Sequence, residues 1–175
     1  MPFTVLTRGT HLLRILVLGL TSVSTSIPAT AADDVVETRL MTLELATDIA
    51  RGAVIACREM GYQVSAVVVD RSAVVQVVLR DPLATRFHTQ LAQDKANAVI
   101  LSSVSGTEFL RNRPEIIATM NHLDDLLVLQ GGLPIRAAGA MLGAIGVSGA
   151  MGGDKDEVCA AQSLKAVADR LAFIE

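Results

Sequence analysis

The stretch that decides the fold lies near the C-terminus and reads GGLPI at residues 131–135 and GAMLGAIGVSG at residues 139–149. Residues 140–147 are apolar throughout and too few to span a membrane, which is typical of a strand buried on both faces. Gly143 and Gly146 inside that strand indicate either that another part of the backbone approaches it closely or that the strand has a bulge. We therefore expect the rest of the chain to pack around this strand.

A glycine-rich exit follows the strand, and Asp154 then stands where the N-cap of a helix over residues 154–173 is expected. The turn over residues 146–153 leads into a helix N-terminus, a place that can hold an anion. The alternative is a tight turn required by packing alone. The turn is not a P-loop, because no Gly-Lys-Ser/Thr follows it.

The N-terminus has the pattern of an export signal. Arg8 and Arg14 precede or flank a short apolar run at residues 15–20, and small residues close the segment at residues 29–32. We predict a signal peptide over residues 1–32, a flexible mature start over residues 33–39 and one domain over residues 40–175. The mature protein is then periplasmic or secreted, with no membrane span.

Composition narrows the function. The formal charge of −3 argues against a nucleic-acid binder, which needs a basic face. With 51% apolar and 3% aromatic residues, the core is built from small aliphatic side chains. This much apolar surface favours a homo-oligomer, although the signal segment contributes to the percentage.

The sequence carries no catalytic signature. It has no nucleophile elbow with a Ser/His/Asp set, no HExxH and no zinc-like spacing of ligands. Cys57 and Cys159 form no CxxC motif. An exported chain with two cysteines can form one bridge, but both lie among apolar helix residues, so we expect two buried thiols.

Apolar spacing predicts the remaining elements. Thr42 is expected to cap a helix that ends at Gly61, and its small residues suggest close packing. Residues 64–69 and 74–79 form a hairpin whose strands are both largely buried. Helices follow at residues 88–101, 107–111 (with Thr107 as its cap) and 114–120, and a short strand at residues 126–129. The order predicts an α+β fold, a central antiparallel sheet of about five strands flanked by helices.

These pieces resemble the GlcG/HbpS-like haem-binding family over residues 40–172. The resemblance lies in VVVD at residues 67–70, RD at 80–81, the A-x-x-K-A-x-A pattern at 92–98, the glycine-rich strands at 131–149 and the acidic Asp154. It implies a profilin-like fold, a homo-oligomer and haem as a ligand. The family's hairpin turn usually reads D-x-x-G, whereas here Ala73 takes the glycine position, so the turn type can differ.

The haem interpretation selects five residues. His88 opens the helix that carries Lys95, and its imidazole is our predicted iron ligand; the alternative is a solvated first-turn residue. Arg80, Arg86 and Lys95 are predicted to receive the haem propionates, since cations bind carboxylates. Alternatively, Asp70 or Asp81 pairs with Arg80, and Lys95 holds a buried polar network. His122 is a second candidate ligand, although the neighbouring acids oppose propionates.

The sequence thus favours an exported haem- or small-ligand-binding protein. An enzyme or accessory factor acting on a small organic acid or on haem is the alternative, with Arg80 and Lys95 as its polar anchors. A purely structural oligomer subunit is a third reading. We expect binding rather than catalysis, because no catalytic pattern is present.

Overall fold

The computed structural model describes residue 1 and residues 38–172, and the chain divides into two units, Met1–Val36 and Glu37–Glu175, of which the second holds nearly all of the described residues. The predicted signal peptide and most of the predicted mature start therefore lie outside the described residues. The second unit holds these elements, in order: α1 (Leu43–Glu59), β1 (Ser65–Asp70), β2 (Val75–Arg80), α2 (Arg86–Ser102), α3 (Gly106–Asn112), η1 (Pro114–Ile116), α4 (Ile117–Met120), β3 (Gly132–Ala137), β4 (Ala140–Ser148), α5 (Gly153–Ala166) and α6 (Ala168–Ala172).

The sheet is antiparallel and its strand order is β2-β1-β4-β3. The predicted central strand, β4, pairs with β1 on one side and with β3 on the other, and seven consecutive residues of it are buried. The α+β class is confirmed, with four strands in the sheet. Residues 126–129 form no strand, because Leu127 N–H bonds the carbonyl of Asp94 on α2 instead of a strand.

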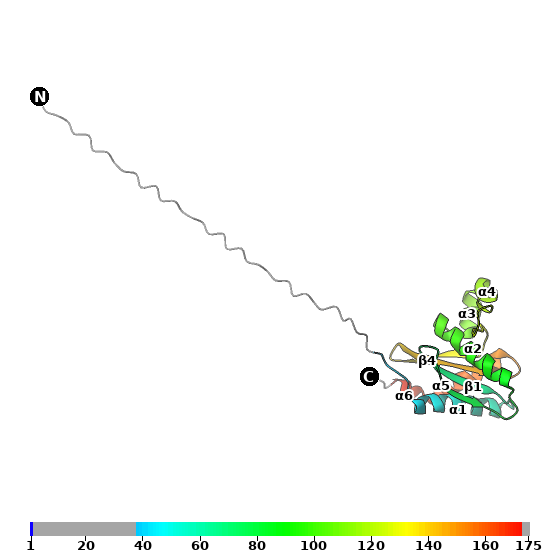
Figure 1. The fold of residues 1–175 in the computed structure, drawn as a ribbon. Coiled ribbons are helices and arrows are strands. Elements are labelled where there is room, and N and C mark those ends of the chain that lie inside the picture. Colours follow the sequence, from blue (N-terminus) through cyan, green and yellow to red (C-terminus); the bar gives the residue numbers. More distant parts are fainter. Residues whose placement is uncertain (2–37, 173–175) are drawn as a thin grey trace. The chain divides into compact units, whose positions relative to one another are not determined.

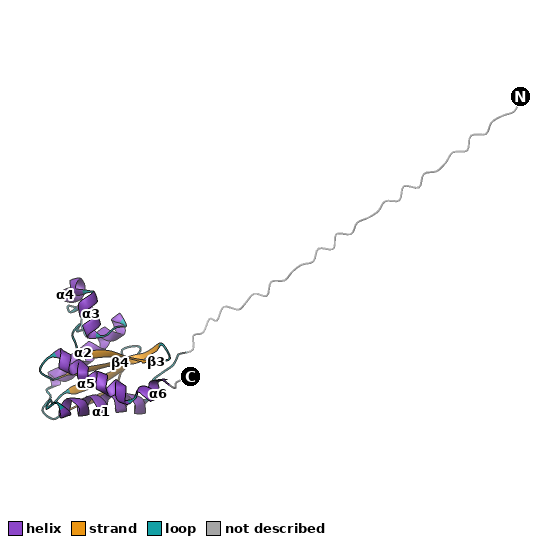
Figure 2. Cartoon of the chain, turned by 180° about the vertical axis from the view of Figure 1, so that it is seen from behind, coloured by secondary structure: helices purple, strands orange, loops and turns teal. Residues whose placement is uncertain are grey.

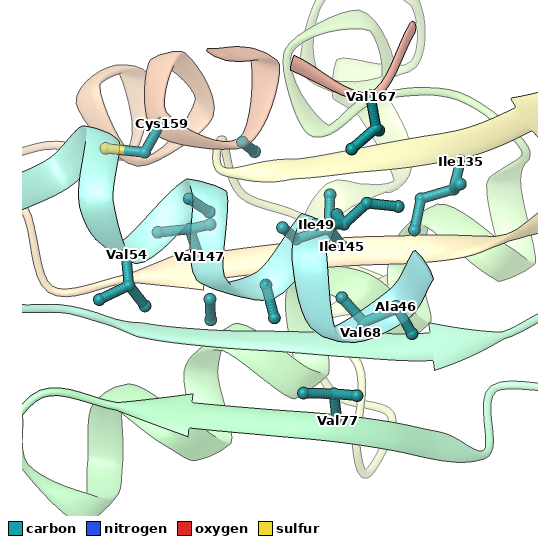
Figure 3. Close-up of a cluster of buried hydrophobic side chains, with 14 of the residues drawn as sticks. Ala46, Ile49, Val54, Val68, Val77, Ile135, Ile145, Val147, Cys159 and Val167 are labelled. Carbon is teal, nitrogen blue, oxygen red and sulfur yellow. The ribbon is translucent and has the colours of Figure 1, made fainter. Parts of the chain in front are cut away.

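Helices cover both faces of the sheet (Figure 1). α2 packs on one face against small side chains of β1 and β4, namely Val67, Val69 and Ala144. α1 and α5 lie on the opposite face, as the view from behind also shows (Figure 2). The larger core is on that side, where Ile49 of α1 meets Val68 and Ile145 of the sheet (Figure 3).

The close approach predicted from the glycines of β4 is confirmed at Gly146. A Cβ atom on this residue would lie 1.8 Å from the carbonyl oxygen of Ala92 on α2. On the other side of the sheet, a Cβ atom on Gly52 of α1 would lie 3.1 Å from the Cβ of Ser163 on α5. Small residues therefore let helices pack close to β4 and to each other, as the composition predicted.

The expectation of two buried thiols is wrong, because Cys57 and Cys159 form a disulfide. α1 and α5 pack side by side, which brings the two Cα atoms to 5.3 Å although 102 residues separate them. Apolar residues surround each cysteine, as predicted, but the sequence alone does not show which helices are neighbours. The bridge closes a long loop and ties the two helices of the larger core together.

Four local predictions also need correction. β2 is an edge strand with alternating exposure, so only β1 of the hairpin is largely buried. The last helix breaks at Val167 into α5 and α6. Gly152, rather than Asp154, takes the N-cap position of α5. Likewise Ser105, not Thr107, caps α3.

The start of α1 follows the prediction, since the Thr42 side chain accepts a hydrogen bond from Leu45 N–H at 3.3 Å. Gly61, with φ of +84°, ends that helix as expected. In the first hairpin, Ala73 adopts φ of +62°, the conformation that the more common glycine would favour. The Asp70 carboxylate fixes this turn by accepting hydrogen bonds from Ser72 and Val74 N–H.

Candidate functional site

Lys95, one of the five predicted site residues, is buried. α2 places its side chain beneath the Gly131-Gly132 turn with 2% of the residue exposed. The ammonium donates to Asp156 Oδ2 at 2.8 Å and to the Val147 carbonyl at 2.9 Å. This is the buried polar network that the sequence left as its alternative role. A ligand carboxylate would have to displace Asp156 to reach Lys95.

The glycine turn is shaped around this ammonium. A Cβ atom on Gly131, whose φ is +110°, would lie 2.9 Å from Lys95 Nζ. The other Asp156 oxygen accepts a hydrogen bond from Ala150 N–H at 2.9 Å, within the glycine-rich turn considered as an anion site. The chain's own carboxylate therefore fills that place, which supports the packing interpretation of the turn.

Asp156 is a residue that sequence reasoning missed. Burial raises the pKa of its carboxyl, while the Lys95 ammonium, the Ala150 N–H and the charge of His88 oppose that shift. The structure thus brings His88, Lys95 and Asp156 into one electrostatic neighbourhood. A possible signal was the acidic residue in the first turn of the last helix, but its partner lies 61 positions away in the sequence.

The half-buried His88 is held at the start of α2 by a capping bond. Thr85 N–H donates to His88 Nδ1 at 3.2 Å, and His88 stands three residues after this N-cap. Because Nδ1 accepts here, the neutral ring carries its proton on Nε2. Binding of iron through Nε2 therefore requires the ring to give up the capping bond or to lose that proton.

The exposed His122 has the opposite arrangement. Its Nδ1 bonds the carbonyl of Ala118, and a carbonyl can only accept, so Nδ1 carries the hydrogen. Nε2 then presents an unprotonated lone pair, which is the form of histidine that binds metals. The hydrogen bond of its ring thus favours His122 as a metal ligand, whereas the surrounding sequence favours His88 as the iron ligand.

The two predicted arginines lie on either side of the loop into α2. Arg80 Nη1 donates to the carbonyls of Asp81 at 3.2 Å and Pro82 at 3.3 Å, and also to that of Ala84. The proposed pairing of Arg80 with Asp70 or Asp81 carboxylates does not occur. The Arg86 guanidinium stacks 4.1 Å from the centroid of the Phe87 ring, at the helix turn that carries His88.

Of the five predicted residues, α2 therefore carries His88, Arg86 and Lys95, whereas Arg80 ends β2 and His122 follows α4. Among these five, Lys95 is the residue whose side chain is buried and makes its hydrogen bonds inside the protein. No group of three or more His, Cys, Asp or Glu in the described part of the chain is arranged to hold a metal ion. Among the same residues, no helix is both long and apolar enough to cross a membrane.

Comparison with a family model and comparison with solved structures both identify HbpS-like proteins as similar to this chain. Residues 41–165 match the family described as haem degrading protein HbpS-like. A double mutant of HbpS from Streptomyces reticuli is 31% identical, with 82% of this chain and 98% of that chain covered and a TM-score of 0.72. No curated protein sequence matches significantly.

Two more distant solved structures share the fold. The protein ORFY from Klebsiella pneumoniae is 21% identical and has a TM-score of 0.71, with 78% of this chain and 97% of that chain covered. PduOC, crystallised as a haem complex, is also 21% identical, with a TM-score of 0.67 and coverage of 73% and 95%.

Proposed function

Because the chain belongs to the HbpS-like haem-degrading family, we propose that it is an exported haem-binding protein that works as a homo-oligomer. The observation that carries the proposal is the match to HbpS along 98% of that protein. PduOC adds that a protein of this fold was crystallised with haem.

The residues present offer suitable donors for haem. His88 is the proposed axial ligand, because Arg86 lies in the same helical turn and Arg80 lies just before it, so cations for the propionates are near. Arg86 keeps its guanidinium exposed above Phe87, and Arg80 keeps two of its nitrogens, Nε and Nη2, outside its bonds to the loop carbonyls. When bound, haem would supply an iron centre for ligand or electron chemistry.

A pair of glutamine variants decides which histidine binds iron. His88→Gln keeps a side-chain acceptor at the capping position, so it removes the imidazole without removing the capping bond. Hemin titration should show a Soret shift in the wild type that is lost in His88→Gln and retained in His122→Gln. The reverse pattern would assign the iron to His122, and unchanged spectra in both variants would exclude a histidine ligand.

Export is supported by two features of the sequence and the structure. The first is the charged and apolar pattern of residues 1–32. The second is the Cys57–Cys159 disulfide, since such bridges persist mainly in oxidising compartments. N-terminal sequencing of the cell-envelope fraction should begin at about residue 32 or 33, whereas full-length chain confined to the cytoplasm would contradict export.

The oligomer is supported by apolar side chains around the free edge of the sheet. Val78 lies on edge strand β2, Leu83 in the next loop, and Phe87 and Leu91 on α2, with 37–78% of each residue exposed. Such surface usually marks an interface. Sedimentation at micromolar concentration should give a mass above that of one chain, and a monomer would contradict this part of the proposal.

A further inference from the structure

Three arginines line one cavity on the far side of the sheet from α2. Arg51 and Arg58 stand two turns apart on α1, and Arg80 ends β2 beside them. The cavity has a volume of about 310 Å³, at the lower end of the range of about 300–1,000 Å³ for ligand pockets. Of these three arginines, the sequence analysis selected only Arg80.

The cavity has an excess of positive charge. Asp81 is its one acidic lining residue, so three arginines and one aspartate line it and two positive charges remain (3 − 1 = 2). That carboxylate is already engaged, because Asp81 is fully buried and binds Arg58 and Val64 N–H. Arg51 has no hydrogen bond or ion pair with any described residue.

Two of the guanidinium groups are held in place by the protein. Arg58 directs Nε, at 2.8 Å, and Nη2 to one oxygen of Asp81, which leaves its Nη1 hydrogens available. Arg80 bonds loop carbonyls through Nη1 alone, which leaves Nε and Nη2. Groups fixed in this way lose little entropy when they bind an anion, and the planar fork of arginine matches a carboxylate.

The remaining wall is apolar and consists of Val54, Ile55 and Leu79. Inorganic phosphate would leave this wall without a partner, whereas an organic acid would cover it with its carbon chain. Hydrophobic burial and charge-assisted hydrogen bonds then act on the same ligand.

We propose that this cavity binds a small organic dicarboxylate, with its carboxylates on Arg51, Arg58 and Arg80 and its carbon chain on the apolar wall. The site does not include His88, but it shares Arg80 with the proposed haem site, so the test uses Arg51, which lines this cavity and has no part in the proposed haem site. The sequence analysis gave a protein that acts on a small organic acid as the alternative function, and this cavity is where such an acid would bind. Two arginines of α1 would then be its anchors instead of Lys95.

The test is calorimetric titration of the purified protein with the α,ω-dicarboxylates from malonate to suberate, and with inorganic phosphate. We expect saturable binding that is strongest at one intermediate chain length and weakens with salt. Arg51→Gln should weaken it about tenfold or more, the scale of one lost charge-assisted contact. Arg111→Gln, which removes the same charge from an exposed position on α3, should leave the affinity unchanged.

Each other outcome overturns the proposal. No binding, or equal effects of Arg51→Gln and Arg111→Gln, removes the site. Phosphate binding as tightly as the best dicarboxylate shows a general anion site. A change in the mass of the assembly, in place of the affinity, assigns the cavity to an interface with a second copy. Hemin titration of Arg51→Gln should match the wild type, so failure of this site and failure of haem binding are distinguishable.

Discussion

The two faces of the sheet are stabilised by different interactions. On the α2 face, small side chains form the core, and Lys95 of α2 makes a buried ion pair with Asp156 at the start of α5. On the α1 and α5 face, a larger aliphatic core is joined by the Cys57–Cys159 disulfide. The two faces differ in the environment of their cationic residues. Lys95 is buried inside the fold, whereas the arginines on the other face remain exposed to solvent.

The largest effect is expected from breaking the ion pair of the α2 face. Lys95→Met leaves the Asp156 carboxylate buried without its partner, which should lower the free energy of unfolding by about 3–5 kcal/mol. Urea unfolding followed by circular dichroism measures this change.

The matched control is the double variant with Asp156→Asn. It removes the uncompensated charge and keeps an oxygen for the Ala150 N–H, so it should be more stable than Lys95→Met alone. A loss below about 1 kcal/mol in the single variant would mean that the pair is not desolvated as described.

The opposite face should respond next most strongly. Replacing both cysteines by alanine should lower the free energy of unfolding by about 2–4 kcal/mol, because the bridge constrains a long loop of the unfolded chain. The wild type with reductant should lose the same amount, and the double variant should not respond to reductant. Equal unfolding curves for oxidised and reduced wild type would contradict a bridge.

The next effect is smaller and is an increase in the free energy of unfolding. It is expected in the turn between β1 and β2, outside both cores. Ala73 adopts φ of +62°, which costs a residue with a side chain about 1–2 kcal/mol. Ala73→Gly should therefore stabilise the protein by about 0.5–1 kcal/mol, since glycine also gains entropy in the unfolded chain. Ala161→Gly, at an exposed position of α5, is the control and should destabilise it by about 1 kcal/mol. A loss of stability in Ala73→Gly would refute the strained turn.

The smallest effect concerns a carboxyl on α2. Burial, followed by the nearby Asp125 carboxylate, raises the pKa of Asp94. The folded chain therefore holds this proton more tightly than the unfolded chain, so the contribution stabilises at low pH and is lost as the pH rises through the raised pKa. Asp94→Asn should raise the melting temperature slightly at neutral pH.

The same substitution should have no effect at a pH below the ordinary aspartate range, where both states carry the proton in the wild type. Melting curves of the variant and the wild type at the two pH values provide this comparison. A destabilised Asp94→Asn at neutral pH would contradict the assigned shift.

Local signals in the sequence predicted much of the fold. Three confirmed features depend only on neighbouring residues or on steric rules, so they can be recognised in the sequence. They are the cap at Thr42, the helix end at Gly61 and the close approach at Gly146. The resemblance supplied the family, and the comparisons confirm it.

Some wrong predictions were local, such as the caps expected at Asp154 and Thr107, but others depended on contacts between distant parts of the chain. The bridge between Cys57 and Cys159 and the partner of Lys95 are set by how helices pack on the sheet. Residues 126–129 have the apolar character of a strand, but their backbone meets α2. Periodicity reports which face of an element is apolar and does not report which element covers it.

Native mass spectrometry of the protein from the cell-envelope fraction, after incubation with hemin, tests export, assembly and haem binding in one experiment. We expect an assembly of several chains, each starting at about residue 32 or 33 and each able to carry one haem. Single chains without a hemin adduct, starting at Met1, would contradict this expectation.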